Sequence, residues 1–174
     1  MSLMQLVLDL IDLRSFSNLW YWIALAVTWS TASHWVLGVP FDMVLRARRQ
    51  GGQAMADLES IVRVNVNRML YITNEAGVIL QAAVCCALTM LALLGFWYLV
   101  EFCQAVFLLA FPLAVVGALS LRTATRIERD GDTGEVLCRR LNRHRIGIQV
   151  IGIMAILITA LWGMLQNFNV SPLG

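Results

Sequence analysis

The spacing of charged residues is the feature that most constrains this chain. Asp, Glu and Arg are missing from four long stretches: 15–41, 76–100, 102–121 and 146–174. Each stretch can supply the roughly 20 apolar residues that a helix needs to cross about 30 Å of hydrocarbon. An unpaired backbone is not tolerated in lipid, so these segments must be helical there. The spacing predicts four transmembrane helices, over 18–39, 76–97, 102–121 and 146–166.

The composition supports lipid as the solvent of this chain. Apolar residues make up 59% of the sequence and charged residues only 14%, whereas about a quarter of a soluble domain is charged. So much apolar surface cannot all be buried in a core this small, and we expect membrane lipids to cover the rest. The net charge of +2 is too small to indicate a nucleic-acid partner, which requires a clustered basic surface.

The arginines predict the orientation. All basic residues are Arg, and all of them except Arg14 fall in the segments 42–75 and 122–145. Loops enriched in arginine stay in the cytoplasm, so both segments should lie on the cytoplasmic face of a bacterial inner membrane, with both termini in the periplasm. Aromatic anchors are expected at the periplasmic interface, at the ends of the spans: Trp20, Trp22, Trp97 and Tyr98.

Three further elements are expected outside the spans. Residues 1–13 have an apolar and a polar face and predict a short interfacial helix. Apolar residues recur at three- and four-residue steps over 53–70, which predicts a cytoplasmic amphipathic helix leading into the second span. The segment 122–145 is expected to be a loop followed by a helix. The predicted fold is an all-α integral membrane four-helix bundle with short amphipathic interfacial helices.

Two local interactions are expected within these cytoplasmic elements. Glu59 and Arg63 have the spacing of an i,i+4 ion pair. Asp132, followed three residues later by Glu135, resembles a capping box at the start of a helix.

His34 is the candidate cofactor ligand. It lies inside the predicted first span, and an intramembrane ionisable residue is a functional candidate by default. A neutral imidazole can bind haem iron or the magnesium of a chlorophyll. The other interpretation is a hydrogen bond from His34 to a neighbouring helix. No bound cofactor is otherwise expected.

Two arginine clusters flank the spans on the predicted cytoplasmic side. They are candidates for contact with a protein partner or with anionic lipid headgroups: Arg46, Arg48, Arg49, Arg139, Arg140, Arg143 and Arg145. Small residues also recur along the spans and would let helices approach closely, within the chain or towards a partner: Ala26, Ser30, Ala83, Ala87, Ala110, Ala114, Ala118, Gly147 and Gly152.

No pattern in the sequence indicates catalysis, so we expect a protein that is not an enzyme. Neither a Ser-His-Asp grouping, a phosphate-binding loop nor a metal cluster is apparent. The stretch 130–135 resembles the start of a calcium loop, but Leu141 stands where the loop needs its last carboxylate. A turn between two helices is the favoured interpretation.

Three segments carry a resemblance to a known family: Arg14–Trp22, Trp29–Asp42 and Arg63–Tyr71. They resemble a family of small four-helix membrane proteins of alphaproteobacteria that are often labelled as a component of the SUF (SufBCD) iron–sulfur assembly complex. The resemblance covers about the first 125 residues. Bacteria of this group carry abundant photosynthetic and respiratory membrane complexes with small helical subunits.

These observations favour a non-catalytic accessory or assembly subunit that docks on a larger inner-membrane complex, such as a photosynthetic reaction-centre or antenna core or a respiratory complex. Two alternatives stay open: a small membrane subunit of a secondary transporter, and a membrane anchor for iron–sulfur cluster assembly. A cytoplasmic N-terminus would favour the transporter.

Overall fold

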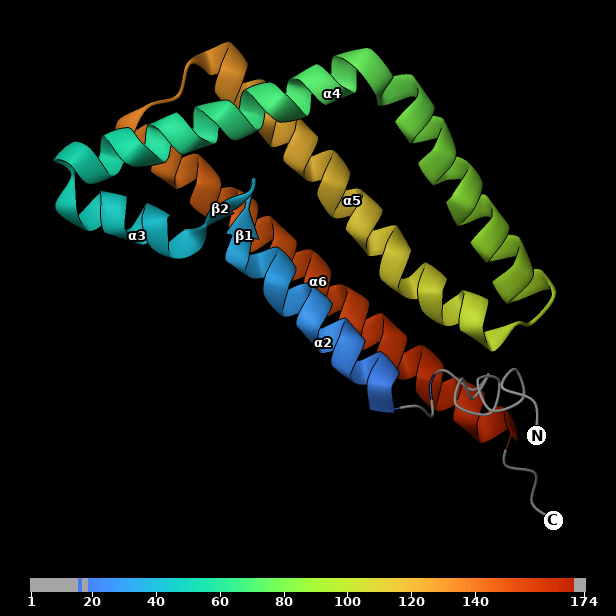
Figure 1. Cartoon of the computed structure of the whole chain (residues 1–174). Helices are drawn as coiled ribbons and strands as arrows, with labels where there is room; N and C mark the ends of the chain where they lie inside the picture. Colours follow the sequence, from blue (N-terminus) through green and yellow to red (C-terminus); the bar gives the residue numbers. More distant parts are fainter. Residues whose placement is uncertain (1–15, 17–18, 171–174) are drawn as a thin grey trace, which may run out of the picture.

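The computed structural model describes Phe16 and residues 19–170, with side chains up to Gln166. This part of the chain is almost entirely helical (Figure 1). The helix predicted over 1–13 lies outside the described residues. In chain order the elements are α2 (Leu19–His34), β1 (Trp35–Val36), β2 (Val39–Pro40), α3 (Phe41–Gln50), α4 (Gly52–Ala92), the π-helical turn η2 (Leu93–Trp97), α5 (Glu101–Asp130) and α6 (Gly134–Val170).

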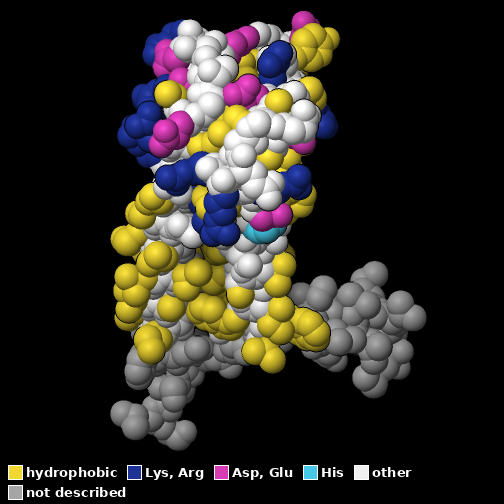
Figure 2. Space-filling view, turned by 90° about the vertical axis from the view of Figure 1, so that its left-hand side faces the viewer, with side chains coloured by type: hydrophobic (Ala, Val, Ile, Leu, Met, Phe, Trp, Pro, Cys, Tyr) yellow, Lys and Arg dark blue, Asp and Glu magenta, His cyan; other side chains and the backbone are white. Residues whose placement is uncertain are grey.

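The charged residues gather at one end of the molecule, as Figure 2 shows. We call this end the head. It consists of the β1–β2 hairpin, α3, the first half of α4, the end of α5 and the start of α6. These elements share one core, formed by Val36, Leu37, Val39, Phe41, Val44, Ala47, Leu58, Val62, Val66, Ala124, Ile127, Leu137, Cys138 and Leu141.

The rest of the described chain forms a layer of helices, which we call the helix layer. The distal half of α4 (76–92) packs on α5, α5 packs on α6, and α6 packs on α2 (Figure 1). Three helices are long and apolar enough to cross a membrane: Gly52–Trp97, Glu101–Asp130 and Gly134–Gln166. The all-α fold and its membrane-length helices agree with the sequence, but a four-helix bundle is not confirmed.

The first predicted span is shorter than expected. Its 16-residue helix α2 is about 24 Å long at 1.5 Å per residue and ends at His34. Residues 35–40 form a hairpin whose turn has positive φ at Leu37 (51°) and Gly38 (74°). Leu37 keeps this strained conformation while its side chain is buried in the head core. The prediction of a helix to residue 39 is therefore wrong, because its last apolar residues fill a protein core instead of facing lipid.

The helix α4 joins two predicted elements in one. The amphipathic helix expected over 53–70 continues without a break into the second span, and its ribbon bends about midway (Figure 1). Near that point the Thr73 hydroxyl donates to the Met69 carbonyl at 2.9 Å, a bond that often bends helices. At the start of α4, Gly51 and Gly52 have positive φ, which allows the reversal after α3.

A short turn joins α5 to α6, so the segment 122–145 is mostly helical. Asp132 forms an ion pair with Arg140 in this turn. The first N–H of α6, on Gly134, donates instead to Glu59 Oε1 of α4 at 2.7 Å. The expected capping box is thus replaced by a carboxylate from a distant helix. Glu59 caps α6, and no ion pair with Arg63 occurs among the described residues.

Candidate docking surface and arginine clusters

The distal half of α4 is the most exposed part of the helix layer. None of the residues in its most apolar 18-residue stretch is buried within the chain, against 28% for the corresponding stretch of α6. Val78 and Ile79 have 85% and 74% of their surface exposed. Packing against α5 therefore uses one side of this helix and leaves the rest to lipid or to another protein.

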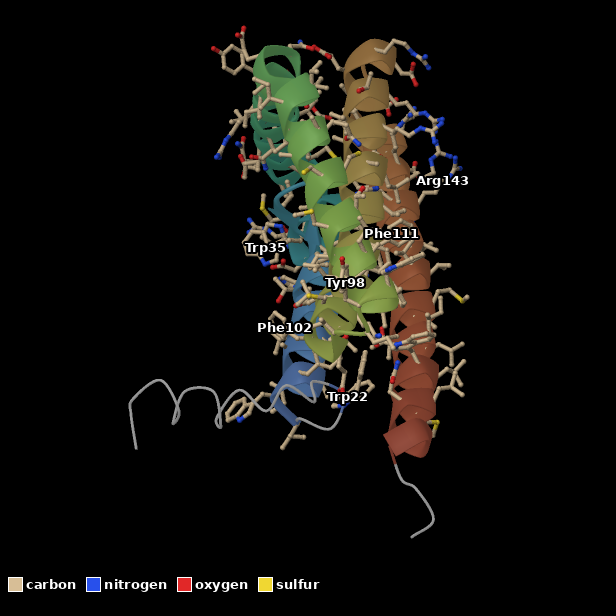
Figure 3. The ribbon with its side chains drawn as sticks, turned by 90° about the vertical axis from the view of Figure 1, so that its right-hand side faces the viewer. Trp22, Trp35, Tyr98, Phe102, Phe111 and Arg143 are labelled. Atoms are coloured by element: carbon tan, nitrogen blue, oxygen red, sulfur yellow. The ribbon has the colours of Figure 1, made fainter. Side chains whose placement is uncertain are left out.

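An open groove of about 550 Å³ runs between α4 and α5. Cys85, Leu88 and Thr89 line its α4 side, and Phe107 and Phe111 line its α5 side. The two phenylalanine rings stack with their centroids 5.6 Å apart. Figure 3 shows Phe111 on α5 beside α4. The groove has the chemistry of a site for an apolar helix or an acyl chain.

Polar side chains lie on this side of α4: Thr89 lines the groove, and Gln81 lies one turn before Cys85, outside the groove lining. Gln81 donates to Cys85 Sγ at 3.3 Å, and Thr89 donates to the Cys85 carbonyl at 2.8 Å. Within the described residues, no donor reaches the side-chain oxygen of Gln81. Gln81 lies six residues beyond Glu75 (81 − 75), about 9 Å along the helix, so hydrocarbon would leave this amide poorly satisfied.

The small residues divide between inward and outward roles. A Cβ at Gly152 would lie 2.8 Å from the Trp29 ring, and one at Gly147 would lie 3.0 Å from Leu119, so these glycines allow α6 to approach α2 and α5. In contrast, Ala83 and Ala87 are exposed on α4. The outward-facing alanines leave room for a close helix contact from outside the chain.

The first arginine cluster lies on α3. Phe41, Val44 and Ala47 face the head core, and this places Arg46, Arg48 and Arg49 on the exposed side. Arg46 donates to Gln50 at 3.2 Å. These three guanidinium groups are therefore available at the surface of the head.

The second cluster contains residues with different roles. Arg139 and Arg143 are exposed, and Figure 3 shows Arg143 on the outer side of α6. Arg140 donates to Asp130 at 2.9 Å and pairs with Asp132. The hydrogen bond from Arg129 lowers the pKa of Asp130, and Arg140 shifts it in the same direction. Arg140 thus holds the turn between α5 and α6.

Arg145 is an internal structural residue. Its Nε donates to the Ser33 carbonyl in the last turn of α2 at 3.2 Å. Its guanidinium carbon lies 3.9 Å from the centroid of the Phe41 ring. A cation at a helix C-terminus is favoured by the helix dipole, and Arg145 therefore fastens α2 to the head. Among the arginines proposed for outside contact, Arg140 and Arg145 are mainly engaged within the chain.

His34 is the last residue of α2, where its side chain is exposed. Its ring meets the Trp35 ring edge-on, with centroids 5.9 Å apart. Within the described residues, His34 forms no hydrogen bond to a neighbouring helix. The described part of the chain also has no group of three or more His, Cys, Asp or Glu side chains placed to hold a metal ion.

A buried amide network lies near the opposite end of the helix layer, and sequence reasoning missed it. Gln104 is 1% exposed and donates to the Gly95 carbonyl at 2.8 Å. Its oxygen accepts from Trp162 Nε1 and from Gln166, each at 3.0 Å. The network joins η2, α5 and α6. Gln104 falls in the third charge-free stretch, and its position in the sequence gave no sign of its partners.

The chain was compared with protein-family models, with curated proteins and with solved structures, and none of them matches it.

Proposed function

We propose that this protein is a non-catalytic accessory subunit that binds a transmembrane helix of a larger inner-membrane complex through the distal half of α4. The observation that carries the proposal is that no residue in the most apolar stretch of α4 is buried within the chain, while Gln81 lies on this stretch one turn before Cys85, which lines the groove. Lipid can cover apolar side chains, but it cannot satisfy the amide oxygen. A polar group on a partner helix would satisfy it.

The proposed topology places the head in the cytoplasm. Arginine-rich segments are retained on that side, and twelve of the 13 basic residues (13 − 1, all except Arg14) lie in the segments that build the head. With α2 as a short fourth crossing, both termini lie in the periplasm. Trp20, Trp97 and Tyr98 are 70–79% exposed and would lie at the periplasmic interface.

The resemblance described above favours a photosynthetic or respiratory complex as the partner. A reporter fused to the N-terminus tests the topology on which this proposal depends. A periplasmic signal agrees with it. A cytoplasmic signal contradicts it and favours the transporter subunit instead.

Photo-crosslinking in native membranes tests the docking surface. A photoreactive amino acid replaces Val78 on α4 or, as the matched control, Ile153 on α6. These side chains are 85% and 66% exposed, so both meet whatever surrounds the protein. We expect a discrete protein adduct from position 78 and only lipid adducts from position 153. Lipid adducts alone at both positions would overturn the proposal.

A second experiment tests the role of the amide. Gln81→Leu, without any crosslinker, should reduce co-purification in mild detergent of the partner that crosslinking from position 78 identifies. Gln149→Leu is the control, because Gln149 is also exposed but lies only four residues from Arg145 (149 − 145), close enough to the interface to reach water. Equal losses in the two variants would show that Gln81 has no specific role.

A further inference from the structure

A second pocket, of about 540 Å³, lies between α5 and α6 where the head meets the helix layer. Four arginines line it: Arg126 from α5, and Arg139, Arg140 and Arg143 from α6. No acidic residue is among the described residues that line it. The pocket is separate from the α4–α5 groove and has the opposite chemistry.

Three of the four charges are available to a ligand. Asp130 and Asp132 occupy Arg140, while Arg126, Arg139 and Arg143 are exposed and form no ion pair within the described residues. Like charges that converge on one concavity attract an anion, and guanidinium groups bind phosphate oxygens in pairs of hydrogen bonds. The pocket therefore favours a phosphate group.

The inner wall of the pocket is polar and firmly held. His144 is 4% exposed, and its ring nitrogens lie 3.2 Å from the hydroxyl oxygens of Ser120 and Thr123. These hydroxyls in turn donate to backbone carbonyls of α5 at 2.8 Å. A neutral imidazole donates its one N–H to one of these hydroxyls, and the contacts of His144 hold α5 against α6 at the level of the arginines, so the pocket is present before a ligand arrives.

The pocket opens onto an apolar surface at its membrane end. Arg139, Arg143 and Gly147 follow one another at four-residue steps, so they form a single stripe along α6. Gly147 contributes no side chain beside Leu119. Beyond it, Val150 and Ile153 are 55% and 66% exposed. A ligand held by the arginines would thus continue onto the exposed apolar surface of α6.

We propose that this pocket binds the headgroup of an anionic phospholipid, with its phosphate between Arg126, Arg139 and Arg143 and its acyl chains along the apolar face of α6. A free phosphate would use only the charged half of the site. An acidic protein segment would meet lipid at the open end. A phospholipid matches both the arginines of the pocket and the apolar surface of α6. Basic pockets between transmembrane helices on the cytoplasmic side are suited to such headgroups.

The test measures lipid binding to the purified full-length protein by native mass spectrometry, with phosphatidylglycerol or phosphatidylcholine added to the detergent micelles. The pocket variant is Arg139→Gln with Arg143→Gln. The control variant is Arg46→Gln with Arg48→Gln, which removes the same charge from α3. We expect phosphatidylglycerol to bind the wild type and the control alike, and the pocket variant to lose affinity on the order of tenfold.

An equal loss of phosphatidylglycerol affinity in the pocket variant and the control variant would overturn the proposal, because the lipid would then be attracted by the general charge of the surface. Equal binding of phosphatidylcholine would also overturn it. Thermal stabilisation by inorganic phosphate alone, as large as that by phosphatidylglycerol, would assign the site to free phosphate instead. Arg126→Gln on the opposite wall is an independent variant: if Arg139→Gln with Arg143→Gln does not fold, this single substitution must still weaken phosphatidylglycerol binding.

Discussion

The head and the helix layer share α4, α5 and α6, but these helices bury different amounts of apolar surface in the two regions. In the head, apolar residues from six elements bury one another and the charges face outward. In the helix layer, the buried apolar cluster among the described residues is small, with Leu25, Trp29 and Ala155 and their partly buried neighbours, and many large apolar side chains stay exposed. The head completes its core within its own chain, whereas the layer leaves much of its apolar surface uncovered by the chain.

The largest expected effect comes from truncating a leucine in each region of α6. Leu141 is 0% exposed in the head core, and Leu157 is 51% exposed in the layer. Leu141→Ala removes buried methyl groups and leaves a cavity, so it should lower the free energy of unfolding by about 2–5 kcal/mol. Leu157→Ala should cost well under half as much, because lipid or detergent fills the space. Thermal unfolding in detergent compares the two, and similar losses would contradict the distinction between the regions.

A medium effect is expected at the contact between α2 and α6. In Gly152→Ala the new Cβ would lie 2.8 Å from the Trp29 ring, so the indole must move, at a cost of about 1–3 kcal/mol. Gly117→Ala on α5 is the control, because nothing lies within 4 Å of its added Cβ. Tryptophan fluorescence and thermal unfolding report the change. If both variants behave like the wild type, α2 is less firmly packed than the structure shows.

The smallest expected effect is on the free energy of unfolding at acidic pH, through Asp130. Because Arg129 and Arg140 lower the pKa of Asp130, its charged form stabilises the fold. The stabilisation from this charged carboxylate is fully present above the pKa of Asp in the unfolded state, about 4. It is lost as the pH falls through the lower pKa of Asp130 in the folded state. Asp130→Asn should therefore be slightly less stable than the wild type at pH 7, and the difference should shrink below about pH 4. Unfolding midpoints between pH 7 and pH 3 test this, and a constant difference would contradict it.

The sequence predicted the helices well because charge and apolarity act locally. The stretches 76–97, 102–121 and 146–166 all fall within observed helices and their π-helical extension. The predicted end of the first span, at residue 39, was wrong because apolar residues are favoured both in lipid and in a protein core. Gly38 and Pro40 were the available signal, since a turn is more probable than a helix at such a pair.

The candidate sites were less predictable because they depend on contacts between distant segments. The two arginine clusters were visible in the sequence, but Arg145 and Arg139 look alike there. Only the fold shows that Arg145 meets the end of α2 while Arg139 lines a pocket. Glu59 was assigned a local partner, yet it caps a helix that begins 75 residues later. Spacing rules describe neighbours on one helix, and they hold no information about which helices meet.

The head core has a consequence for biosynthesis. Its residues run from Val36 to Leu141, so the core cannot close until the first turns of α6 have left the ribosome. By then the hairpin formed by α4 and α5 has already been made, before α6 is available to pack against α5. Closure of the head is therefore a late step in folding, and it sets the spacing of helices that have already been made.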